Sequence, residues 1–139
     1  MARAIVAALQ GNELAVDAAG KALYHAAAVA ASNYVVALLA VAERWMVTAG
    51  VNGNDARPAL AALAAGAVDS VARLGPAAAL TGPVARGDGD TVGAHLARLS
   101  GKDRHLYSVL AETALVLARQ RGLDRASADG LAHLLESIE

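Results

Sequence analysis

The stretch from residue 18 to residue 49 constrains the fold of this chain more than any other part of the sequence. It contains no proline and no glycine after Gly20, and Gly50 follows it directly. Because proline and glycine are the residues that interrupt helices, their absence predicts one long helix, about 45 Å in length for roughly thirty residues. Residues 22–42 carry no charged side chain, so this helix needs apolar surroundings.

An apolar helix of this length is either the buried centre of a helical domain or a membrane span. The stretch includes His25, Ser32 and Asn33, and most of its other residues are alanine, which gains little from transfer into lipid. The flanking segments also lack the excess of Lys and Arg on one side that orients membrane helices. We therefore expect a buried central helix in a cytoplasmic protein with no membrane contact.

The rest of the composition points to an all-α fold. The chain has 37 alanines among its 139 residues, and alanine is the best helix former and a poor strand former. The 12 basic and 13 acidic side chains nearly balance, so we expect no nucleic-acid partner. The chain has no cysteine, and its four histidines lack the paired spacing of metal ligands, so we expect neither a disulfide nor a metal site.

Capping residues and apolar periodicity predict the other elements. The predicted helices span 3–10, Asn54 or Asp55 to Leu74, Asp88 or Asp90 to Leu99, 102–121, and a last segment that starts at Asp124. In the helix 102–121 the spacing predicts a buried face made of Leu106, Val109, Leu110, Thr113 and Leu117. Residues 13–17 alternate between polar and apolar as a strand does, although no other segment offers a partner strand.

Polar side chains on the predicted central helix form the first candidate site. At 100° per residue, His25 lies about 40° and Asn33 about 120° from Lys21 around the helix, so His25 and Asn33 share a broad face. One interpretation is an acid–base site, in which His25 or Lys21 passes a proton to a substrate oxygen that Asn33 holds by hydrogen bonds. The alternative is that His25 and Asn33 satisfy backbone groups between packed helices.

The second candidate site is the segment Leu-Thr-Gly-Pro-Val-Ala-Arg-Gly-Asp at 80–88. Its glycines and proline fix the backbone path, and Arg86 is suited to bind an anion beside the N-terminus of the next helix. The alternative is a plain connection between helices in which Arg86 pairs with Asp88 or Asp90. The sequence leaves both interpretations open. It contains no Gly-x-Gly-x-x-Gly or phosphate-binding loop, so the chain lacks its own means of holding a dinucleotide.

Residues 21–39, Lys-Ala-Leu-Tyr-His-Ala-Ala-Ala-Val-Ala-Ala-Ser-Asn-Tyr-Val-Val-Ala-Leu-Leu, and residues 80–88 together resemble a known domain. It is the C-terminal helical domain, of unknown function, of uncharacterised bacterial oxidoreductases with an N-terminal Rossmann-like domain. These proteins are similar to ketopantoate reductases, pyrroline-5-carboxylate reductases and the wider 6-phosphogluconate dehydrogenase C-terminal-like superfamily. The resemblance implies an all-α domain over 18–139 around one long central helix. It also implies that 1–17 is a helix–strand remnant of a Rossmann-like cofactor domain.

The resemblance also implies roles for particular residues. In ketopantoate reductases a long helix presents a catalytic lysine and two asparagines one and two turns later. If Asn33 is the later asparagine, His25 stands at the lysine position and Val29 replaces the middle asparagine. His25 would then be the general acid, with Lys21 as the alternative proton donor. Thr81 and Arg86, with Asp88 beside them, would contact the substrate.

The function implied is a substrate-binding and dimerisation domain of an NAD(P)-dependent reductase of small keto acids or imines. The NAD(P) would be bound by the missing N-terminal domain, so the chain alone should be inactive. We also expect a homodimer, because the apolar helix needs more cover than the rest of the chain supplies and related domains dimerise through these helices. Two alternatives remain: a non-catalytic helical dimerisation or interaction module, and a small-molecule sensor that uses the same cleft.

Overall fold

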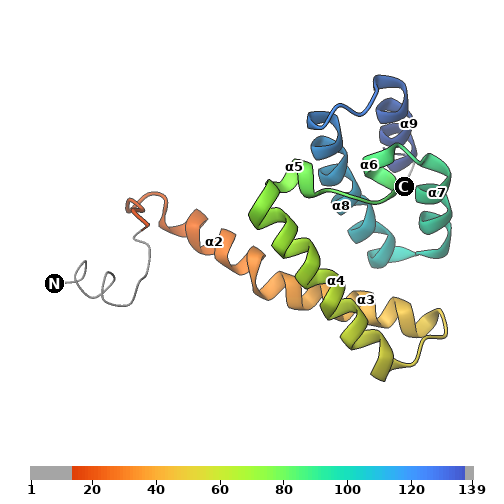
Figure 1. Cartoon of the computed structure of the whole chain (residues 1–139), viewed down its shortest axis with the longest axis horizontal. Helices are drawn as coiled ribbons and strands as arrows, with labels where there is room; N and C mark the ends of the chain where they lie inside the picture. Colours follow the sequence, from red (N-terminus) through yellow and green to blue (C-terminus); the bar gives the residue numbers. More distant parts are fainter. Residues whose placement is uncertain (1–13, 137–139) are drawn as a thin grey trace. The chain divides into compact units, whose positions relative to one another are not determined.

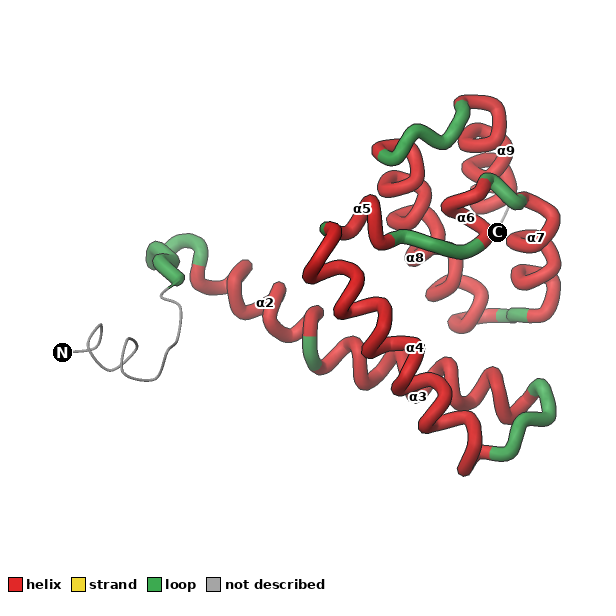
Figure 2. Tube along the Cα trace, viewed as in Figure 1, coloured by secondary structure: helices red, strands yellow, loops and turns green. Residues whose placement is uncertain are grey.

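Residues 14–136 are described by the structure, which is a computed structural model, and all of their regular structure is helical (Figure 2). The chain divides into two compact units, the first ending at Gly50 and the second beginning at Val51. The prediction of an all-α protein is confirmed for the described residues.

Two helices make up the described part of the first unit (Figure 1): α2, Lys21–Ala31, and α3, Asn33–Thr48. The prediction of one unbroken helix was wrong, because Ser32, with φ −122° and ψ −71°, leaves the α-helical conformation. The Ser32 hydroxyl lies 2.6 Å from the carbonyl oxygen of Ala28, one turn back. A hydroxyl that hydrogen-bonds to the preceding turn competes with the helix's own bonds and bends the helix.

The expected burial of this helix is not found among the described residues. Neither α2 nor α3 contains a buried residue. Leu23 is 75% and Val36 is 69% exposed, and Tyr24, Tyr34 and Val47 are also exposed. Lys21–Thr48 is the one stretch among the described residues that is long and apolar enough to cross a membrane, judged by length and composition alone. The described residues of the first unit therefore do not cover the apolar surface of α2 and α3 by themselves.

The predicted N-terminal remnant is described only in part. The predicted helix 3–10 lies outside the described residues, as does the first residue of the predicted strand 13–17. Residues 14–17 form no strand, so that prediction was wrong where the structure tests it. A single alternating segment cannot satisfy its backbone hydrogen bonds without a partner strand, and the described residues contain none.

The described part of the second unit contains the helices α4 Gly53–Leu74, α5 Pro76–Ala79, α6 Pro83–Arg86, α7 Gly89–Arg98, α8 Gly101–Gln120 and α9 Arg125–Glu136. Along the chain, the two short helices α5 and α6 lie between the long helix α4 and the three longer helices α7, α8 and α9. The predicted helices are confirmed to within one or two residues at the ends that can be compared. Asn52 caps α4 by accepting a hydrogen bond from the N–H of Asn54, and Gly75 ends α4 with a φ of 78°.

Helix α8 is the centre of the second unit, and α5, α6, α7 and α9 all pack against it (Figure 1). The core consists of Val84, Val92, Leu96, Ala111, Leu115, Ala128, Leu131 and Leu135. The predicted buried face of α8 was wrong. Val109, Leu110 and Thr113 are exposed, and α8 instead buries Ser108, Ala111, Leu115 and Ala118. Small side chains on that face allow the neighbouring helices to approach α8 closely, which the larger residues would prevent.

Candidate functional site

The three candidate residues of the first unit lie on two different helices. Lys21 and His25 are one turn apart on α2, and both are exposed. Asn33 is the first residue of α3, and its side-chain oxygen lies 3.1 Å from the Ser32 hydroxyl. Because the helix is interrupted between His25 and Asn33, the angle of an ideal helix no longer relates these two residues. Their cooperation at one substrate therefore stays a prediction.

The segment 80–88 of the second unit is shaped by residues that leave the helical conformation. Leu80 is extended and Gly82 has a φ of 91°, which an L side chain rarely adopts. Pro83 then begins the short helix α6, and Gly87, with a φ of 72° and ψ of 21°, ends it in the left-handed conformation. This path carries Thr81 on an extended loop and Arg86 at the end of α6, so both side chains lie at the surface.

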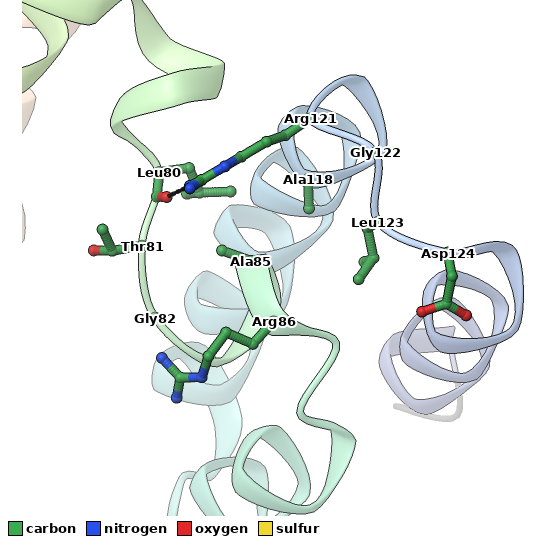
Figure 3. A pocket seen from close by; sticks show the side chains of 10 residues that line it. All are labelled: Leu80, Thr81, Gly82, Ala85, Arg86, Ala118, Arg121, Gly122, Leu123 and Asp124. Atoms are coloured by element: carbon green, nitrogen blue, oxygen red, sulfur yellow. Dashed lines mark hydrogen bonds between the residues drawn. The ribbon is translucent and has the colours of Figure 1, made fainter.

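A pocket of about 530 Å³ lies beside this segment. Thr81 and Arg86 both line it, and Ala85 and Ala118 leave it hollow because their side chains are small (Figure 3). Arg121 at the end of α8 also lines it and donates a hydrogen bond of 2.5 Å to the carbonyl oxygen of Leu80. The structure thus brings together two of the three predicted substrate contacts. Asp88, the third, is not part of the pocket wall.

Asp88 is instead the N-cap of α7. Its Oδ1 accepts a hydrogen bond from the N–H of Thr91 at 3.0 Å, and its Oδ2 accepts one from the Thr91 hydroxyl at 2.7 Å. The hydrogen bond from the Thr91 N–H is the largest of the effects that hold the pKa of Asp88 below its ordinary value. Arg86 lies 3.8 Å from Oδ2, a loose and exposed ion pair. Asp88 therefore fits the interpretation of 80–88 as a plain connection between helices. Arg86 keeps most of its hydrogen-bond donors for another partner.

The lowered pKa of Asp88 predicts an acid-dependent loss of stability. A carboxyl group whose pKa is depressed by folding stabilises the protein above its unfolded-state value of about 3.8. This stabilisation is lost as the pH falls through the lower, folded-state pKa. In thermal unfolding from neutral to strongly acidic pH, we expect Asp88→Asn to keep the cap at neutral pH and to show a shallower acid dependence than wild type. Asp88→Ala should be less stable already at neutral pH, and equal acid dependence of wild type and Asp88→Asn would contradict the assignment.

Arg121 was not among the residues predicted from the sequence. The sequence does indicate that Arg121 could contact a carbonyl oxygen, because Arg121 is a basic residue directly before Gly122, where a helix was predicted to end. Basic side chains at such ends often contact carbonyl oxygens of their own helix. The partner of Arg121 is Leu80, 41 residues earlier in the chain. A contact between residues so distant in sequence is not visible in local patterns.

Among residues 14–136, no three His, Asp or Glu side chains are grouped as a metal site requires. His95 and Tyr107 make an edge-to-face ring contact, with Nδ1 of His95 2.9 Å from the Tyr107 hydroxyl. It connects α7 to α8. Burial raises the pKa of Tyr107, which is expected for a phenol that stays neutral at a helix contact.

Comparison with known proteins gives one family match. The sequence model of a family described as Domain of unknown function (DUF2520) matches residues 1–114. No curated protein and no solved structure matches the chain. The matched part includes both segments that carry candidate residues, 21–39 and 80–88. It ends within α8, so Arg121 and all of α9 lie beyond it.

Proposed function

The chain belongs to the family of the Domain of unknown function DUF2520, and within this family we propose that it is the substrate-binding and dimerisation domain of an NAD(P)-dependent reductase. The substrates proposed are small keto acids or imines. The proposal includes kinship with the C-terminal domains of the 6-phosphogluconate dehydrogenase superfamily, on the resemblance of residues 21–39 and 80–88.

The observation that carries the proposal is the pocket beside the segment 80–88. The resemblance assigns Thr81 and Arg86 to substrate contacts, and both residues line one pocket of about 530 Å³. This volume lies in the range of small-molecule sites. A guanidinium and a hydroxyl that line one pocket suit a substrate that carries a carboxylate next to a carbonyl oxygen. The pocket therefore offers the polar groups that a keto acid needs.

The chain does not fit a nicotinamide nucleotide by itself. It has no glycine-rich dinucleotide loop, and its described residues form no strand from which such a loop could start. We therefore assign the cofactor, which supplies the hydride, to a domain outside this chain. The residues of this chain would bind the substrate and supply the proton: His25 is the proposed donor to the developing alkoxide or amine, with Lys21 as the alternative. Asn33 would hold the substrate by hydrogen bonds.

The experiment that tests this proposal compares the chain with the complete reductase that we infer. Each is mixed with NADPH or NADH and with a series of 2-keto acids and cyclic imines, and cofactor oxidation is followed by absorbance. We expect turnover by the complete protein and none by the 139-residue chain. Oxidation of NADPH by the chain alone would contradict the proposal, and so would a complete protein that turns over neither substrate class.

The exposed apolar surface of α2 and α3 supports the dimerisation part of the proposal. Large exposed apolar surfaces mark interaction sites. Five large apolar or aromatic side chains of these helices are 49% or more exposed: Leu23, Tyr24, Tyr34, Val36 and Val47. This observation equally favours the alternative function, a helical interaction module without catalysis. The two alternatives differ in the activity experiment above, because only the first requires turnover by the complete protein.

We expect the purified chain to be a homodimer at micromolar concentrations, with a mass of about twice 14.0 kDa. Val36→Glu, which places a charge on the apolar surface of α3, should yield a monomer, because an unpaired charge is costly to bury in an interface. Light scattering coupled to size exclusion measures both masses.

The matched control is Val116→Glu, which changes an exposed valine of α8 in the second unit and should leave the dimer intact. A wild-type monomer would contradict the dimer. A chain that is recovered only in detergent or lipid vesicles would point to a membrane as the cover of α2 and α3 instead.

A further inference from the structure

The pocket has two rims that come from distant parts of the chain. Figure 3 shows the loop with Thr81 and Gly82 on one side and the end of α8 with Arg121 and Gly122 on the other. A side chain added at Gly82 or at Gly122 would meet no atom within 4 Å. These two glycines, which both have positive φ, thus widen the space between the rims. The pocket is open to solvent and large enough for a metabolite of moderate size.

Arg121 is the best-placed polar group in this pocket. Its side chain runs from the end of α8 to the carbonyl oxygen of Leu80, so its guanidinium is fixed at the rim (Figure 3). A guanidinium has five N–H donors, and the bond to Leu80 uses one of them. No other partner of the Arg121 side chain is found among residues 14–136. A fixed guanidinium with unused donors is suited to bind a planar oxyanion in bidentate fashion.

The charges of the pocket wall indicate which oxyanion fits. Arg86 and Arg121 contribute two positive charges, and Asp124 contributes one negative charge. The carboxylate of Asp124 accepts a hydrogen bond from the N–H of Ser127 at the start of α9, which lowers the pKa of Asp124. The wall therefore carries one net positive charge, which a monoanion balances. A dianion such as phosphate would leave one negative charge unbalanced on this wall.

We infer that this pocket binds a small organic monocarboxylate, with the carboxylate on Arg121 and the apolar part against Ala85, Ala118 and Leu123. The inference deepens the proposed function and rests on it for the choice of a keto acid as ligand. It adds Arg121 as a substrate-binding residue, and Arg121 lies beyond the part of the chain that the family match covers.

The experiment is a titration of the 15N-labelled chain with 4-methyl-2-oxopentanoate, followed by the amide signals of Gly82 and Gly122. We expect saturable shifts of both signals. Arg121→Gln should weaken binding by about tenfold, because a hydrogen bond to a charged group is lost. Arg121→Lys should retain part of the affinity. Arg73→Gln, which changes an exposed arginine of α4 that pairs with Asp69, is the control and should bind like wild type.

Two further ligands test the chemistry of the site. The neutral ketone 4-methyl-2-pentanone lacks the carboxylate and should not saturate, and inorganic phosphate should bind more weakly than the keto acid. The inference is overturned if the keto acid causes no saturable shifts, if the neutral ketone binds equally well, or if Arg121→Gln has wild-type affinity while its spectrum shows an intact fold. Binding by the chain together with an inactive complete protein would remove the proposed reductase function alone. Turnover without binding at this pocket would remove the present inference and the substrate contacts proposed for Thr81 and Arg86, and would leave the proposed reductase reaction standing.

Discussion

Gly87→Ala is expected to lower the free energy of unfolding of the second unit by about 2–4 kcal/mol. Two physical effects add at this position. The backbone φ of 72° is unfavourable for any residue with a Cβ atom. A Cβ at Gly87 would also lie 2.7 Å from Cβ of Ser127 and 3.0 Å from Cδ1 of Leu123. Because Cβ of Ser127 is fixed to the backbone of α9, the helix itself would have to move.

The matched control for this prediction is two residues away. Gly89 begins α7 and has no positive φ, and a Cβ at this position would meet no atom within 4 Å. Gly89→Ala should therefore keep or raise the stability by less than about 1 kcal/mol. Urea unfolding of both variants measures the difference. Equal losses in the two variants would contradict the close packing of the turn after α6 against α9.

His25→Ala in the complete reductase is expected to reduce kcat by about 10²–10⁴-fold, which is the usual contribution of a positioned general acid. The side chain is exposed on α2, so its removal should leave the thermal unfolding temperature nearly unchanged. A steady-state assay with the keto acid substrate, together with a thermal unfolding scan, separates the loss of catalysis from the loss of fold.

Two further variants serve as a control and as a test of which residue donates the proton. His105→Ala changes an exposed histidine of α8 that has no proposed role, and it should keep the wild-type kcat. Lys21→Ala identifies the donor: a larger loss for Lys21→Ala than for His25→Ala would assign the proton transfer to Lys21. Full activity of both single variants would contradict an acid–base role of α2.

The helix boundaries were predicted well from the sequence wherever residues close to the boundary determine it. The boundaries of α4 and α7 follow from short polar caps and from glycines, which act within a few residues. In α7 the observed cap is Asp88, one of the two residues predicted, Asp88 or Asp90. In α4 the structure uses Asn52 instead of Asn54 or Asp55, because several polar residues in a row can each accept the first hydrogen bonds of a helix.

Features that depend on tertiary contacts were not predicted. The bend at Ser32 arises from a hydroxyl bond to Ala28, and a serine within a helix does not always form one. The buried face of α8 consists of small residues, whereas the apolar spacing favoured the leucines and valines of another face. The spacing of apolar residues ranks the faces of a helix by hydrophobicity, and it contains no information on how closely two helices approach each other. The contribution of Arg121 to the pocket was not predicted either, because only the folded chain brings Arg121 beside Leu80.

The most direct test of the proposed reductase domain is the mass of the natural gene product under denaturing conditions, measured by immunoblotting with an antibody against this chain. A cofactor domain of ordinary size adds about 100–150 residues. We therefore predict a single polypeptide of about twice 14.0 kDa in cells of the source organism. A polypeptide of 14.0 kDa would mean that the domain works without a nucleotide-binding fold of its own, and this result would contradict the proposal.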